Sequence, residues 1–185
     1  MLEKYLIGID AGFTHTGVSI FKSNKGKLNY LNGDTFITEK REKKHQVRIA
    51  DDDADRIMKL ILDLDKFLSD NGCYDGEIYC VIELPSAGAQ GARALRAMAL
   101  ITGAIVTFVT LKNIAVEYVT PNDVKIAVTG KKTASKDEIM NRIRKAMSNA
   151  NFPKTKDKFE HIADSIGAIL HVRKYSQLYK IFVNK

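Results

Sequence analysis

Residues 6–20 read LIGIDAGFTHTGVSI, and the topology expected for the whole chain follows from this stretch. An apolar run ends at Asp10, a turn rich in glycine and threonine follows, and a second apolar run begins at Val18. This pattern predicts two antiparallel strands joined by a short turn, with one carboxylate at the end of the first strand. Gly12 and Gly17 allow the backbone to approach a bulky neighbour closely or to adopt a positive φ.

A buried carboxylate at the end of a central strand needs a metal ion, a cation or backbone donors as its partner, because burying an unpaired charge is costly. Three interpretations of Asp10 remain open from this stretch. The side chain is a metal ligand in a nuclease of the ribonuclease H type, part of the phosphate loop of an actin-like ATPase, or the side chain of an Asx turn in a hairpin.

The size and charge of the chain limit its class. Its 185 residues suit one domain with a complete core and are few for two. Its 29 basic and 22 acidic residues give a formal net charge of +7, which favours a polyanionic partner. We expect no signal peptide and no apolar run long enough to cross a bilayer, hence no membrane partner. Cys73 and Cys80 lack metal-ligand spacing, which predicts reduced thiols in a cytoplasmic protein.

Hydrophobic periodicity predicts the elements that follow the hairpin. We expect strands over 27–38, 76–84 and 114–119, and helices over 49–68, about 89–109, after 120, after 135 and about 159–175. Thr120 before Pro121 and the capping box that begins at Ser135 mark two of the helix starts. The helix over 89–109 is so apolar that it should lie deep in the core or at a dimer interface. The aspartates at 51–55 suit the dipole of their helix and are not counted as a metal site.

Four side chains that are distant in sequence form a candidate metal site. Asp10 and Glu83 each end an apolar strand, so neighbouring strands would bring both carboxylates to one edge of the sheet. His161 and Asp164 are three residues apart and project from one face of the last helix. Together they suit two divalent ions about 3.5–4 Å apart, which can clamp a scissile phosphate. Carboxylates suit Mg²⁺, and one imidazole also suits Mn²⁺.

Each of these residues also has an ordinary structural explanation when it is taken alone. Glu83 could form a salt bridge at a strand end, and a lone histidine such as His161 is more often a helix-surface residue than a ligand. Asp164 lies on an otherwise apolar helix, where an unpaired carboxylate is costly, and is therefore harder to explain without a ligand.

A series of short motifs occurs in one order along nearly the whole chain. They are Gly8-Ile9-Asp10-Ala11-Gly12, Thr16-Gly17, Val81-Ile82-Glu83, Pro121-Asn122-Asp123-Val124-Lys125, Val128-Thr129-Gly130, Ala134-Ser135-Lys136 and His161-Ile162-Ala163-Asp164-Ser165-Ile166-Gly167-Ala168. In this order they resemble the RuvC family of Holliday junction resolvases, within the ribonuclease H-like superfamily. The middle motifs, which carry two lysines around a Val-x-Gly turn, are the most diagnostic.

The resemblance implies one α/β, ribonuclease H-like nuclease domain over residues 1–185. Its sheet would be mixed and five-stranded, with the first three strands antiparallel, the others parallel, and helices on both faces. The implied activity is that of a homodimeric crossover junction endodeoxyribonuclease that makes paired symmetric nicks and leaves 5′-phosphate and 3′-hydroxyl ends. Asp10, Glu83, His161 and Asp164 would be the metal ligands and catalytic residues, with Mg²⁺ as cofactor and Mn²⁺ able to substitute.

The resemblance also suggests where DNA is bound. Lys125 and Lys136 match basic positions near the active cleft of the family, although each taken alone is equally compatible with a helix-surface lysine. Lys131 and Lys132, the basic loop 40–48 and the C-terminal tail from 173 are further candidates for contacts with phosphates. Ser86 stands where the family has an aromatic residue, so selectivity for four-way junctions over other branched DNA is expected to differ.

Other functions remain as alternatives. One is a YqgF-like nuclease that acts on RNA; the length and the segment from Lys125 to Lys136 favour the resolvase instead. Another is a non-catalytic protein that binds branched DNA, against which the complete ligand set argues. An actin-like ATPase needs two ribonuclease H-like halves, for which the chain is too short. The sequence leaves open whether a helicase acts as a partner.

Overall fold

The computed structural model describes residues 2–24, 26–41, 48–84 and 91–184. Ser86 and most of the basic loop 40–48 therefore lie outside the described residues. The elements follow in the order β1 (Lys4–Asp10), β2 (His15–Asn24), β3 (Lys27–Ile37), α1 (Ile49–Asp70), the 3₁₀ turn η2 (Cys73–Asp75), β4 (Glu77–Glu83), α2 (Ala92–Leu111), β5 (Ala115–Val119), α3 (Pro121–Thr129), α4 (Lys136–Ala146), α5 (Lys156–Tyr175) and α6 (Gln177–Asn184).

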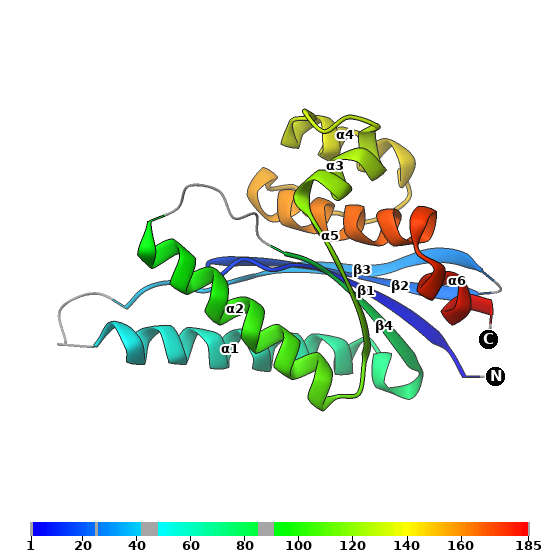
Figure 1. The fold of residues 1–185 in the computed structure, drawn as a ribbon. Coiled ribbons are helices and arrows are strands. Elements are labelled where there is room, and N and C mark those ends of the chain that lie inside the picture. The colour runs from blue at the N-terminus through cyan, green and yellow to red at the C-terminus, as the bar shows by residue number, and fades with distance from the viewer. Residues whose placement is uncertain (1, 25, 42–47, 85–90, 185) are drawn as a thin grey trace.

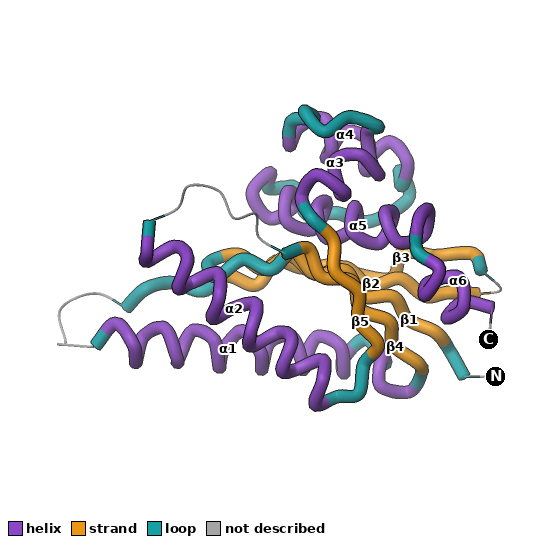
Figure 2. Tube along the Cα trace, in the orientation of Figure 1, coloured by secondary structure: helices purple, strands orange, loops and turns teal. Residues whose placement is uncertain are grey.

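One five-stranded sheet forms the centre of the molecule, with the strand order β3-β2-β1-β4-β5 (Figure 2). The strands β1, β2 and β3 are antiparallel, whereas β4 pairs with β1 and β5 in parallel. The mixed sheet predicted from the sequence is therefore confirmed. The register of β2 against β3 shifts between Ile20 and Phe21, but β3 continues unbroken from Lys27 to Ile37.

Helices cover both faces of the sheet, as predicted (Figure 1). Alternate residues of β1 point to opposite faces. Ile7 and Ile9 pack with the buried side chains of α1 and α2, and Leu6 packs with those of α3, α4 and α5. Two apolar cores therefore lie on either side of β1, which is buried along almost its whole length.

Local signals fix the boundaries of α3 and α4. Thr120 and Asp123 form a capping box at the start of α3, and Ser135 and Glu138 form another at the start of α4. Gly130 ends α3 with φ 81°, a left-handed conformation that costs glycine little. The C-terminal segment, expected only as a cationic tail, contains a further helix, α6, which Tyr179 anchors in the α5-side core.

The helix α2 decides between the two positions expected from the sequence and contradicts one other expectation. It is not deep in the core, because its buried residues are only Ile101, Ile105, Phe108 and Val109. It is also long and apolar enough to cross a membrane, with a mean hydropathy of 1.9, so the expectation that no run reaches this length was wrong. Alanine, threonine and glycine residues separate the large aliphatic residues of α2, so the sequence does not show one continuous run of large apolar side chains. Length and composition do not distinguish a spanning helix from one that a protein partner covers.

Two glycines allow α5 to lie directly on the sheet. A Cβ atom at Gly17 would lie 2.1 Å from the backbone oxygen of His161, and one at Gly8 would lie 2.1 Å from that of Ser165. Both distances are far below van der Waals contact, so no larger residue fits without displacing the helix. The backbone of α5 thus touches β1 and β2 at two points.

We expect the substitution Gly17→Ala to lower the free energy of unfolding by about 3 kcal/mol or more, because the added methyl group must push α5 off the sheet. Gly91→Ala is the matched control, since a Cβ atom there has no heavy atom within 4 Å and the backbone is extended, with φ −65°. The free energy of unfolding of this variant should change by no more than about 1 kcal/mol. Urea denaturation of both variants checks this, and equal stabilities would contradict the close contact.

Candidate active site

Two carboxylates meet at the end of the central strands. Asp10 and Glu83 are the last residues of β1 and β4, and the parallel register pairs them directly. Asp10 lies two residues after Gly8, and Glu83 two residues after Val81, so both side chains point to the α5 face. Here the structure agrees with the arrangement expected from the sequence.

The N-terminal half of α5 brings the other two candidate ligands to the same edge. The imidazole Nδ1 of His161 lies 2.7 Å from the Asp10 carboxylate oxygen Oδ2. Asp164 follows one turn later and lies close enough for the charge of Asp10 to act on it. The contact of Gly17 with the His161 backbone fixes the height of α5 above the strand ends. All four predicted ligands therefore gather in one place.

The carboxylates repel one another in a site of low solvent exposure. Burial, followed by the charges of Asp10 and Asp164, raises the pKa of Glu83 to about 9. Burial and the charge of Asp10 raise the pKa of Asp164 to about 7. The Glu83 oxygen Oε2 is buried and has no hydrogen-bond partner among the described residues. Three acids in this arrangement need positive charge before all of them can ionise.

His161 supplies part of that charge. Burial acts to lower the pKa of His161, but the hydrogen bond and charge of Asp10 outweigh burial, and the pKa is raised. The ring of His15 stacks on the ring of His161, with centroids 5.2 Å apart and planes 6° apart. His15 also lies 3.4 Å from the carboxylate of Asp157. His15 was not among the residues predicted for the site, because its only signal in the sequence is its position five residues after Asp10.

Two of the four candidate lysines lie beside the acids. The positive charges of Lys125 and Lys136 both act on Glu83 and lower its pKa, against the larger effect of burial. Lys136 also forms an ion pair with Glu160, a neighbour of His161 that the sequence analysis did not consider. Burial acts to lower the pKa of Lys136, but Glu160 and the acids of the site outweigh it and raise the pKa.

Lys131 and Lys132 lie farther along the α3–α4 turn. Both are exposed, and Lys131 is 3.8 Å from the carboxylate of Glu138. Three of the aspartates near the start of α1, which are not counted as a metal site because they suit the helix dipole, form ion pairs. Arg41 contacts Asp55, Arg48 contacts Asp51, and Arg96 contacts Asp53.

The donor set fits hard divalent cations. Carboxylate oxygens and one imidazole suit Mg²⁺ and Mn²⁺, and the unpartnered oxygen of Glu83 is free to take a ligand. Within the described ranges, no three such side chains already have metal-binding geometry. The hydrogen bond between Asp10 and His161 accounts for part of this, because it occupies one oxygen that an ion would need. Small side-chain rotations would have to open this pair.

Comparisons with known proteins agree with the fold and the motifs. The family model described as "Crossover junction endodeoxyribonuclease RuvC" matches residues 6–171. A relative of that name from Fusobacterium nucleatum is 25% identical over 185 residues, covering 96% of this chain and 90% of the relative.

Solved structures are similar over most of the chain. RuvC of Thermus thermophilus in complex with a Holliday junction substrate has a TM-score of 0.70 at 20% identity, covering 95% of this chain and 96% of that one. The yeast mitochondrial Holliday junction resolvase Ydc2 has a TM-score of 0.60 at 10% identity, and the match covers 97% of this chain and 81% of that one. These likenesses show the ribonuclease H-like fold. Because the family model matches most of its length, the chain belongs to the RuvC family of crossover junction endodeoxyribonucleases.

Proposed function

We propose that this protein resolves Holliday junctions by paired symmetric nicks, as a divalent-metal-dependent endodeoxyribonuclease. The observation that carries the proposal is the meeting of Asp10, Glu83, His161 and Asp164 at one edge of the sheet. Membership of the family supports the substrate, and the similar Thermus thermophilus structure holds a Holliday junction. The reduced, buried cysteines suit the cytoplasm as its location.

The same four residues would hold the metal, and Mg²⁺ is our choice because three of the donors are carboxylates. The partnerless oxygen of Glu83 and the raised pKa values of Glu83 and Asp164 support this, since both acids need added positive charge to ionise. When bound, divalent ions activate the attacking water and stabilise the leaving oxygen of the phosphodiester. His161 orients Asp10 through its Nδ1 contact, and the ring of His15 limits the movement of His161.

Lysines on α3, on α4 and in the turn between them would hold the DNA backbone. Lys125 and Lys136 lie close enough for their charges to lower the pKa of Glu83, and they would contact the phosphate nearest to the reaction. Lys131 and Lys132 are exposed on the adjoining turn and would bind phosphates farther along the strand. Such contacts position the DNA without reading its sequence.

Substituting Asp10→Asn should abolish nicking of a synthetic four-way junction in Mg²⁺, with a loss of more than about a hundredfold in rate. Junction binding should be retained, because binding depends on the lysines. Asparagine has nearly the same shape as aspartate, so the fold should survive. Gel assays of cleavage and binding, with a fork, a linear duplex and a structured RNA as further substrates, measure both properties.

Wild-type nicking by that variant would exclude the proposed site. Binding without nicking by the wild-type protein would favour a non-catalytic protein that binds branched DNA. Preferred cleavage of the RNA would favour the YqgF-like alternative.

In EDTA, the free energy of unfolding should fall as the pH rises from about 5 to 9. The pKa of Glu83 is about 9 in the folded protein and near 4.5 when the chain is unfolded, so the folded state holds a proton that the unfolded state releases. The free energy of unfolding is therefore greatest below pH 4.5 and declines as the pH rises toward 9. Glu83→Gln should flatten this decline, whereas Glu77→Gln, an exposed acid at the other end of β4, should not.

Added Mg²⁺ should raise the melting temperature at pH 8 in the wild type and in Glu77→Gln, with a much smaller rise in Glu83→Gln. Thermal melts with and without EDTA measure both effects. Equal pH profiles for the three proteins, or an equal effect of Mg²⁺ on them, would contradict a metal site at Glu83.

A homodimer would place two such sites on one junction. The exposed face of α2 is the surface that we propose for the contact between the two copies. Most of this apolar helix is not buried in the single chain, and Leu95 is 49% exposed. Ala99→Glu puts a charge on the exposed face of α2 and should convert the protein to a monomer in sedimentation experiments. The control Ser69→Glu, at the exposed end of α1, should leave the dimer intact. A dimer that survives Ala99→Glu would rule out this face.

A further inference from the structure

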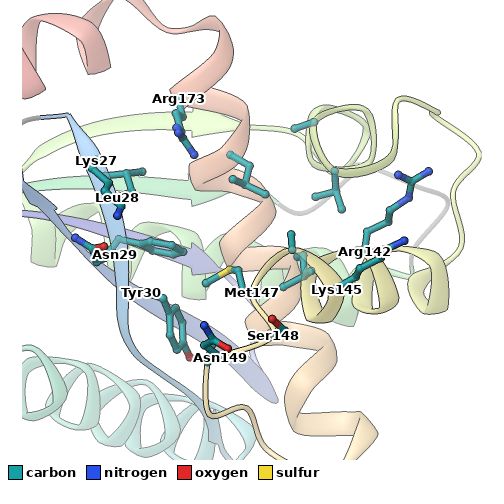
Figure 3. Close-up of a pocket in the computed structure, with 17 residues that line it drawn as sticks. Lys27, Leu28, Asn29, Tyr30, Arg142, Lys145, Met147, Ser148, Asn149 and Arg173 are labelled. Carbon is teal, nitrogen blue, oxygen red and sulfur yellow. The ribbon is translucent and has the colours of Figure 1, made fainter.

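A hollow of about 950 Å³ lies on the α5 side of the sheet (Figure 3). The β2–β3 hairpin forms one wall, and the end of α4 with the segment after it forms the opposite wall. Leu170 and Arg173 of α5 line it as well. Arg173 is twelve residues after His161, which corresponds to about 18 Å along the helix. An occupant of this hollow would therefore not fill the active site.

The floor of the hollow is apolar. Side chains from β3, α3, α5 and the residue that follows α4 pack on the α5-side core but keep part of their surface open, namely Leu28, Tyr30, Val128, Met147 and Leu170. Concave apolar surface with a few polar groups at its rim is typical of a binding site, and the volume is large enough for several side chains of a ligand.

The rim is basic and contains no acid. Lys27, Arg142, Lys145 and Arg173 line the hollow, and no Asp or Glu is among the described residues around it (Figure 3). None of these four cations lies within ion-pair distance of an acid in the part of the chain that the structure describes, unlike Lys136 and many other basic residues. Glu138, near Arg142 on α4, is close enough for the charge of Arg142 to lower its pKa, but it does not line the hollow. Lys145 and Arg173 also lie in last helical turns, where the dipole favours a cation, but this does not account for Lys27 or Arg142.

We propose that this hollow, which we call the basic groove, is a docking site for a peptide segment of a partner protein, with apolar anchors flanked by aspartate or glutamate. The apolar floor would take the anchors, and the four cations would pair with the acids. A nucleic-acid strand suits the groove less well, since stacking needs free aromatic faces and the Tyr30 ring already packs against Phe21 and Phe152. The inference is independent of the proposed nuclease activity.

Panning a phage library of random twelve-residue peptides against the full-length protein tests the proposal. We expect enrichment of peptides in which leucine or phenylalanine lies beside acidic residues. Their affinity, measured by fluorescence polarisation with synthetic copies, should fall at least tenfold in the double variant Arg142→Glu/Lys145→Glu. The double variant Lys59→Glu/Lys66→Glu, which reverses two exposed charges on α1 at the opposite face of the sheet, should bind them as the wild type does.

Junction nicking should be the same in both double variants, because neither changes a residue that we place at the active site or on the DNA path. Failure of the nuclease proposal would leave the peptide result unaffected. The docking proposal is overturned if no acidic peptide is enriched, or if Arg142→Glu/Lys145→Glu binds the enriched peptides normally. It is also overturned if that variant loses affinity for a twelve-nucleotide single strand and keeps its affinity for the peptides.

Discussion

The contact between the backbone of α5 and the strands β1 and β2 is the constraint on which the site depends. It exists because Gly8 and Gly17 have no side chain, so the helix lies against the sheet instead of on a layer of side chains. At that height, His161 reaches Asp10 and Asp164 faces the strand ends. Larger residues at the two glycines would keep the helix but move its ligands away from β1 and β4.

The electrostatics of the site follow from this geometry. Three carboxyl groups gather where water is largely excluded, and one imidazole with two nearby lysines supplies the compensating charge within the chain. The balance is incomplete, as the raised pKa of Glu83 shows. Because the carboxylates repel one another, the folded protein should be less stable alone than with a cation bound between them. Such clusters of groups with shifted pKa values are typical of functional sites.

Much of this architecture could be predicted from the sequence, because its signals are local. Hydrophobic alternation, the N-cap Thr120 before Pro121 and the capping box at Ser135 give most of the strands and helices to within a few residues. The four candidate ligands could be named because strand ends and an i, i+3 pair are visible as patterns. What could not be predicted depends on contacts between distant segments. The stacking of His15 on His161, the pairing of Lys136 with Glu160 and the exposure of α2 leave no periodic signal.

The parallel register of β1 and β4 limits how the gene can change. Neighbouring residues of a strand face opposite sides, so loss or gain of one codon within β4 would turn Glu83 toward α1 and α2 and leave Asp10 facing α5 alone. Insertions in the surface turns do not alter this pairing. Variation in chain length among functional relatives should therefore occur in the connections and spare the seven residues of each central strand.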